Sequence, residues 1–155
     1  MQTKNFTEKI KIIFKRGSLV FFFSFFLNFF WESIHAVLFY EGHSSYLSSY
    51  FIKIISYAST IDALIIFIIF SLGCLFFGKT CWLENYKFKE ASFTIILGII
   101  IAAIIETKAL IFNQWIYNEI MPTILGIGLS PLVQLAITGV LSIFLTSKII
   151  KSKED

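Results

Sequence analysis

Three polar side chains stand at helical spacing in the first apolar stretch of the chain: Asn28, Glu32 and His35. Positions i, i+4 and i+7 fall on one narrow stripe of an α-helix. The residues on either side are mostly Phe, Leu, Ile and Val, which predicts that this helix lies in lipid. A carboxyl group and an imidazole at that depth point to acid/base chemistry or ligand binding, because ionisable groups inside a membrane are expensive.

The later apolar stretches contain further groups of this kind, namely Asp62, Glu106 and Gln134. Trp115 and Tyr117 lie in a polar, aromatic connection between the last two stretches. Two carboxyl groups in different surroundings can divide the roles of acid and base, one protonated and the other ionised. These residues predict a proton-transferring site if the fold brings them together.

The composition places these residues in an integral membrane protein. Of 155 residues, 57% are hydrophobic and only 15% are charged, and the mean hydropathy is +0.80. An ordinary soluble domain is about 25% charged. The net charge of +3 does not predict a nucleic-acid partner, because the positive residues lie just outside the apolar stretches.

The apolar stretches predict an all-α, four-span transmembrane bundle that forms one domain. The expected spans are about 18–40, 59–77, 91–112 and 122–147, with a basic amphipathic lead at 1–17, a polar loop at 41–57 and a basic tail at 148–155. Ser130 and Pro131 predict a helix start, as an N-cap and the first helical position. The last span is therefore expected to be broken or kinked near residues 126–131.

The distribution of Lys and Arg predicts the orientation of the bundle. Five of them lie in the lead, three in the loop at 78–90 and three in the tail, whereas only Lys53 and Lys108 lie on or near the opposite side. Positive residues stay on the cytoplasmic side of a membrane. Both termini are therefore expected in the cytoplasm.

This topology brings the ionisable residues to one depth, within roughly 5–15 Å of the outer interface. We expect a catalytic set on three different helices: Glu32, Asp62 and Glu106. Around it we expect ligand-binding residues: Asn28, Trp31, His35, Trp115, Tyr117 and Gln134. The alternative is that these polar groups serve only helix packing or a subunit contact.

A metal site is a weaker alternative. The spacing Glu32-x-x-His35 suits a divalent metal in a helical bundle, with Asp62 and Glu106 as further ligands. A second Glu-x-x-His motif is missing, which argues against a two-metal site. We therefore predict no cofactor and no metal, and keep a single divalent ion as the alternative.

The polar and small residues together resemble a family of small, uncharacterised, multi-pass bacterial inner-membrane proteins. The resemblance covers about residues 20–140 and rests on these positions: Asn28, Trp31, Glu32, Tyr40, Asp62, Glu106, Trp115, Tyr117, Met121, Pro122, Gly126, Gly128, Pro131 and Gln134. It implies a location in the bacterial inner membrane and no particular activity.

A fainter similarity links Asn28, Trp31 and Glu32 to the integral-membrane terpene cyclases, in which the equivalent Glu acts in proton-initiated cyclisation. It implies a cyclase- or isomerase-type reaction with Glu32 as the general acid, acting on an apolar, isoprenoid-like lipid from the membrane. The alternatives are an oligomeric module that binds or transports a proton, a cation or a small ligand, and a structural subunit. Membrane lipids are the expected partners, and a homo-oligomer is possible.

Overall fold

A computed structural model gives the fold of the chain and describes residues 2–42, 47–77 and 82–152. Within these residues the chain forms four long helices: α1 (Gln2–Phe39), α2 (Ser48–Phe76), α3 (Phe88–Ile111) and α4 (Leu129–Lys151). The shorter elements are the 3₁₀-helix η2 (Trp82–Asn85) and the strands β1 (Thr123–Ile124) and β2 (Ile127–Gly128). The predicted all-α class is confirmed, apart from one small hairpin.

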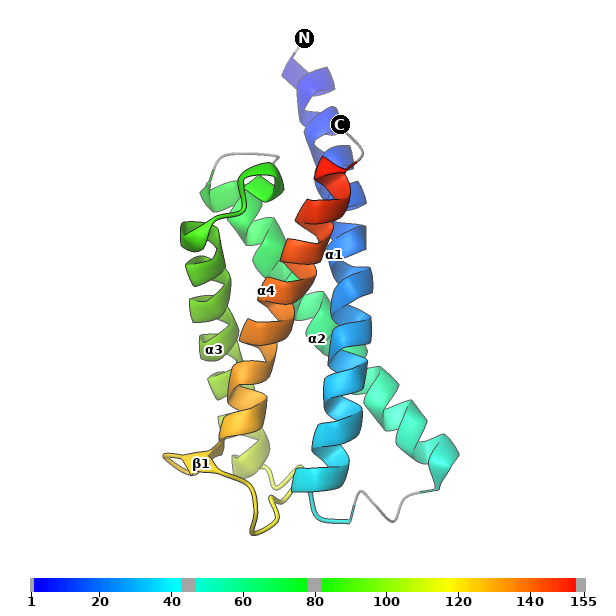
Figure 1. Cartoon of the computed structure of the whole chain (residues 1–155), viewed down its shortest axis with the longest axis vertical. Coiled ribbons are helices and arrows are strands. Elements are labelled where there is room, and N and C mark those ends of the chain that lie inside the picture. The colour runs from blue at the N-terminus through cyan, green and yellow to red at the C-terminus, as the bar shows by residue number, and fades with distance from the viewer. Residues whose placement is uncertain (1, 43–46, 78–81, 153–155) are drawn as a thin grey trace.

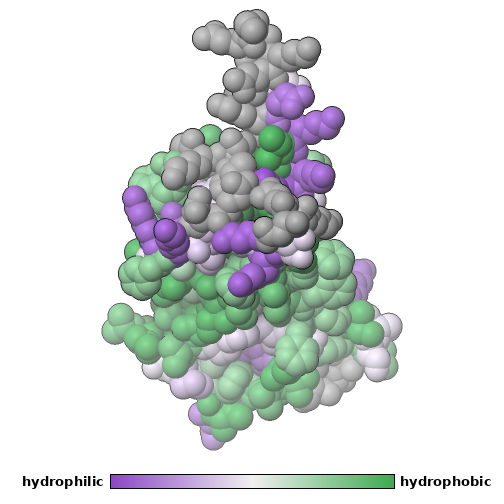
Figure 2. Space-filling view, turned by 45° about the horizontal axis from the view of Figure 1, so that its top comes forward, coloured by the Kyte–Doolittle hydropathy of each residue, from purple (hydrophilic) through white to green (hydrophobic). Residues whose placement is uncertain are grey.

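The helices α2, α3 and α4 are each long and apolar enough to cross a membrane. Large hydrophobic side chains remain exposed along the outside of all three, which is the pattern of a protein surrounded by lipid. Figure 2 shows hydrophobic side chains over most of the visible middle of the molecule, with hydrophilic ones gathered toward the end that carries both termini. The predicted membrane class is thereby supported.

Two helices in the first half of the chain extend beyond the predicted spans. The lead at 1–17 is not a separate element, because α1 continues through it as one helix from Gln2 to Phe39. Much of the predicted loop at 41–57 is helical, since α2 begins at Ser48 instead of residue 59. The Ser and Tyr residues at 48–57 predict a loop by their composition. Neither residue type prevents a helix that packs against a neighbouring helix. The third span was placed within three residues of α3.

The predicted break before the last helix lies where the chain leaves a hairpin. Residues 123–128 form a two-stranded antiparallel hairpin, and α4 begins at Leu129, inside the predicted region of 126–131. The helix is capped by Gly128, so that Ser130 and Pro131 lie inside the first turn and are not the cap and the first position. The structure therefore has the predicted break, in the form of a hairpin followed by an unbroken helix, and only the predicted cap and first helical position were wrong.

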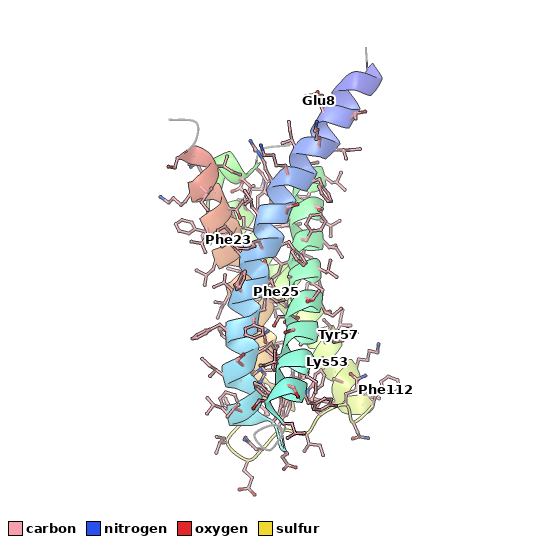
Figure 3. All side chains as sticks on the ribbon, turned by 90° about the vertical axis from the view of Figure 1, so that its right-hand side faces the viewer. Glu8, Phe23, Phe25, Lys53, Tyr57 and Phe112 are labelled. Carbon is pink, nitrogen blue, oxygen red and sulfur yellow. The ribbon has the colours of Figure 1, made fainter. Side chains whose placement is uncertain are left out.

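The helices form a bundle in which α4 lies between α1 and α3, and α2 packs mainly on α1 (Figure 1). Both termini lie at one end, and the turn after α1 and the hairpin lie at the other. Figure 3 places Glu8 at the first end and Lys53 and Tyr57 of α2 toward the second. We refer to the second end as the hairpin end.

A close approach of α3 to α4 sets the width of the bundle. A Cβ atom added to Gly98 would lie 2.8 Å from the backbone nitrogen of Ala136 and 2.9 Å from its Cα atom. Gly98, Ala102 and Glu106 are all buried on this face of α3. The small residues thus act as the four-residue stripe predicts, by letting the helices meet backbone to backbone.

The core has two clusters of buried apolar residues. The larger one includes Val20, Ile66, Phe70, Trp82 and Ile143, and it lies toward the termini. The smaller one, at the hairpin end, consists of Ala36, Tyr40, Ile55 and Met121. Between the two clusters the helix contacts are polar, and this is where the candidate site lies.

Candidate functional site

The side-chain amide of Gln134 is the centre of the polar contacts. Its Nε2 atom donates to Glu32 Oε1 at 2.7 Å, to Asp62 Oδ2 at 2.9 Å and to Asn28 Oδ1 at 3.1 Å. One nitrogen atom therefore joins side chains from α1, α2 and α4. An amide nitrogen carries two hydrogens, one fewer than the oxygen atoms around it.

The position of each group follows from its helix. Asn28 and Glu32 are one turn apart on α1, and Gln134 lies in the second turn of α4. Asp62 is fourteen residues inside α2, deeper than the one turn that the sequence predicted. With 29 residues, α2 is about 43 Å long, whereas the hydrocarbon core of a bilayer is about 30 Å thick. It crosses the bundle obliquely, which brings Asp62 to the level of Gln134 (Figure 1).

A buried line of hydrogen bonds continues from this centre along the interface of α1 and α4. Thr138 Oγ1 donates to Asn28 Oδ1 at 3.1 Å, and Ser24 Oγ donates to Ser142 Oγ at 2.9 Å. Asn28 Nδ2 donates to the Ser24 carbonyl oxygen at 2.8 Å. All four side chains are buried. This line fixes α1 against α4 and holds the Asn28 oxygen toward Gln134.

Glu106 is buried on α3 and receives two donors on the same oxygen. Trp115 Nε1 donates to Glu106 Oε2 at 3.3 Å, and the Tyr117 hydroxyl also donates to it. Gln134 therefore contacts two of the three predicted acids, Glu32 and Asp62, whereas the contacts of Glu106 are with Trp115 and Tyr117. We refer to these three acids with their hydrogen-bond partners as the acid cluster.

The aromatic connection is held in place by backbone contacts with the end of α1. Glu41 N donates to the Ile116 carbonyl oxygen at 3.1 Å, and Asn118 N donates to that of Phe39 at 2.9 Å. Tyr40 stacks on Tyr117, with ring centroids 5.9 Å apart and an interplanar angle of 12°. The end of α1 thus positions Tyr117, and the Tyr117 hydroxyl donates to Glu106 on α3.

Tyr117 also joins the hairpin to the acid cluster, because its hydroxyl accepts a hydrogen bond from Gly128 N at 3.1 Å. Burial raises the pKa of the Tyr117 phenol to about 12, and its hydrogen bond to Glu106 acts in the same direction. The phenol therefore stays protonated, and remains a donor to Glu106, at every physiological pH.

The ionisation of Tyr117 can be measured directly. Subtracting the alkaline absorbance titration of Tyr117→Phe from that of the intact protein, both in detergent, is expected to isolate a tyrosinate signal with its midpoint near pH 12. The unfolded phenol titrates near 10, so the stability due to Tyr117 is present below about pH 10 and falls as the pH rises toward 12. A difference signal centred near pH 10 would contradict the buried contact with Glu106.

The other two predicted ligand residues are His35 and Trp31 on α1. His35 is 2% exposed and packs on Tyr40, with ring centroids 4.6 Å apart. Trp31 is partly buried, and its indole nitrogen has no hydrogen-bond partner among the described residues. Within 2–42, 47–77 and 82–152, no three His, Cys, Asp or Glu side chains are grouped as a metal site requires.

Two residues of the site were missed as site residues at the sequence level. Thr138 lies one turn after Gln134 and contacts the same Asn28 oxygen, so the i, i+4 spacing was an available signal. Tyr40 covers both His35 and Tyr117 and contacts Trp115 through its ring. Its role depends on how the chain turns after α1, which no local pattern predicts.

No family model matches the chain, and no curated protein or solved structure is significantly similar to it.

Proposed function

We propose that the protein is a membrane-embedded enzyme of the cyclase or isomerase type, which uses Glu32 and Asp62 for acid/base chemistry on an apolar, isoprenoid-like lipid. In this proposal α1 is a fourth span, both termini are cytoplasmic, and the hairpin end faces the outer leaflet of the inner membrane. The position of both termini at one end of the bundle and the cluster of Lys and Arg there support this orientation (Figure 1).

The single observation that carries the proposal is the contact of Gln134 with two carboxyl groups and one amide oxygen. Three acceptors surround a nitrogen with two hydrogens, so a proton on one carboxyl group supplies a further donor within the cluster. Two carboxyl groups that share one amide and one proton are suited to exchange roles as acid and base.

The two groups differ in their surroundings from the rest of the cluster. As whole residues, Glu32 and Asp62 are partly exposed on the bundle, whereas Asn28, Gln134 and Glu106 are buried. The proposal requires that a molecule dissolved in the surrounding lipid reach the two carboxyl groups along these partly exposed residues. Glu32 would protonate a carbon–carbon double bond, and Asp62 would accept a proton from a neighbouring carbon atom.

The aromatic residues are suited to the intermediate of such a reaction. Protonation of an alkene gives a carbocation, and the faces of Trp and Tyr rings attract a cation within about 6 Å. Trp31 is adjacent to Glu32 in sequence, and the Trp115 and Tyr117 rings lie at Glu106. In the proposal Glu106 is a positioning residue, because its Oε2 atom is occupied by these two side chains.

The test uses heavy water, since addition of one proton and loss of another leaves deuterium in the lipid. Squalene would be incubated in D₂O with the purified protein in phospholipid vesicles, and the extracted lipid analysed by mass spectrometry. We expect deuterium incorporation with the intact protein, and its loss with Glu32→Gln and with Asp62→Asn.

Glu119→Gln is the matched control, because it makes the same change at an exposed carboxyl group at the hairpin end of the bundle. It is expected to leave incorporation unchanged. Equal incorporation by the intact protein and Glu32→Gln would overturn the proposed roles, as would an absence of incorporation with both squalene and the total lipid extract of the producing cells.

The arrangement of three acceptor oxygens around the Gln134 amide also suits a second function. This function is the binding or transport of a proton or cation by an oligomer of this chain. The oxygen atoms of Asn28, Glu32 and Asp62 all accept from Gln134 Nε2, so a small cation could bind among them only if the Gln134 amide moved aside. Proton flux across vesicles that fails in Glu32→Gln, without any change in lipid, would support this function over the enzyme.

A further inference from the structure

The hairpin before α4 has an unusual turn. Thr123 pairs with Gly128 and Ile124 pairs with Ile127, so that only Leu125 and Gly126 connect the strands. Both have positive φ angles, 53° and 81°. This is the conformation of a type I′ turn, in which Asn, Asp or Gly usually occupies the first position.

Leu125 is the exception to that preference. A bulky residue with φ above zero is a true outlier, and such outliers persist where the side chain has a role. The Leu125 side chain is 98% exposed, so no packing within the described chain explains it. The turn therefore presents a leucine outward at a position where asparagine would fit the backbone better.

Other exposed apolar side chains lie around the same hairpin. Ile124 is 52% exposed, and Ile116 and Ile120 of the preceding connection are 60% and 68% exposed. Ile120, Ile124 and Leu125 form what we call the hairpin tip surface, and the exposed Glu119 lies just outside it. Residues 120–147 contain no Asp, Glu, Lys or Arg, so this surface continues without a charge into the apolar helix α4.

The base of the hairpin is fixed to the bundle. Leu129 N donates to the Pro122 carbonyl oxygen at 2.8 Å, and Gly128 N donates to the Tyr117 hydroxyl. A Cβ atom at Gly128 would lie 2.8 Å from the Met121 Cε atom, which shows how closely the connection packs there. Figure 1 shows the hairpin pointing sideways past the end of α3, across the direction of the helices.

We propose that the hairpin tip surface is a lipid-binding surface, which inserts into the phospholipid bilayer at the interface around the end of α3. A sideways position at the end of a spanning helix places the tip level with the headgroups and the upper acyl chains. Its continuity with the lipid-facing surface of α4 and its lack of charge favour lipid over water or a polar protein surface. The proposal rests on the membrane spans and not on the chemistry of the acid cluster.

Spin labels measure the depth of the tip. In the full chain with Cys74→Ser and Cys81→Ser, a nitroxide would be attached at Leu125→Cys, and at Glu119→Cys as the matched control. The labelled protein would be placed in vesicles of phosphatidylethanolamine and phosphatidylglycerol. We expect the ratio of collisions with oxygen to collisions with a water-soluble nickel chelate to be at least several-fold higher at 125 than at 119.

Two results would overturn the proposal. Equal ratios at the two sites would place the tip in water, and protection of site 125 from both reagents would show that a second copy or another protein covers it. Leu125→Asn provides a second measurement, because asparagine suits the turn. If the tip inserts, this variant is expected to keep the detergent stability of the intact protein and to lose stability in bilayers.

Discussion

Replacing Gln134 with leucine is expected to lower the free energy of unfolding by about 2–4 kcal/mol. The change removes the donor for Asn28, Glu32 and Asp62 together, and measured hydrogen bonds between membrane helices average about 0.6 kcal/mol, with a maximum near 1.7. The estimate exceeds the mean value for three bonds because two of the acceptors are carboxyl groups, which lose more when left unsatisfied. Thermal unfolding in detergent measures the change, as a fall in Tm of about 5–15 °C.

The control separates the lost contacts from a general loss of packing. Leu135→Ala changes the next residue, which is buried in the apolar core. This variant is expected to be destabilising whichever residues occupy positions 32 and 62. In a background with Glu32→Met and Asp62→Leu, the effect of Gln134→Leu should become small, whereas that of Leu135→Ala should remain. An undiminished effect of Gln134→Leu in that background would mean that the amide serves packing alone.

Replacing Gly98 with alanine is expected to destabilise the bundle by about 1–3 kcal/mol, the usual range for an overpacked core. The added methyl group would lie 2.8–3.0 Å from backbone atoms of Leu135 and Ala136, which cannot rotate away. The helices α3 and α4 must then separate, which also displaces Glu106, two turns along α3, from Trp115 and Tyr117. Thermal unfolding and the fluorescence of Trp115 are both expected to report the change.

Gly139→Ala is the matched variant, since Gly139 lies on α4 near α3. The nearest atom to its added Cβ is Thr94 Cγ2 at 3.1 Å, which belongs to a side chain that can adjust. Alanine also favours a helix over glycine by about 1 kcal/mol, which offsets this contact. Gly139→Ala should therefore be close to neutral, and a loss equal to that of Gly98→Ala would show that the close approach of α3 to α4 is not the cause.

The sequence was sufficient for the features that depend on composition and regular spacing. Long apolar stretches gave the helical class and the approximate position of α3, and the spacing of Gly98, Ala102 and Glu106 gave a buried face. It was insufficient where polar residues are helical or apolar residues are not. Ser48–Tyr57 belongs to α2, and Thr123–Gly128 leaves the apolar segment to form a hairpin, because tertiary contacts override local preference at both places.

The candidate site shows the same division. Asn28 and Glu32 share a helical stripe, so their common direction could be predicted from spacing alone. The meeting of Asp62 with Gln134 could not, because it depends on the oblique path of α2. The bonds from Trp115 and Tyr117 to Glu106 depend on the fold of the connection against α1, for which the sequence has no periodic signal.

The order of the helices has a consequence for biosynthesis. Glu32 and Asp62 leave the ribosome well before Gln134. Both acids must therefore enter the insertion machinery before the Gln134 amide can donate hydrogen bonds to them. A nascent chain halted before Leu129 would lack α4 entirely and leave Glu32 and Asp62 without the donor of Gln134. Arrival of the final helix is therefore expected to be the step that commits the bundle to its assembled form.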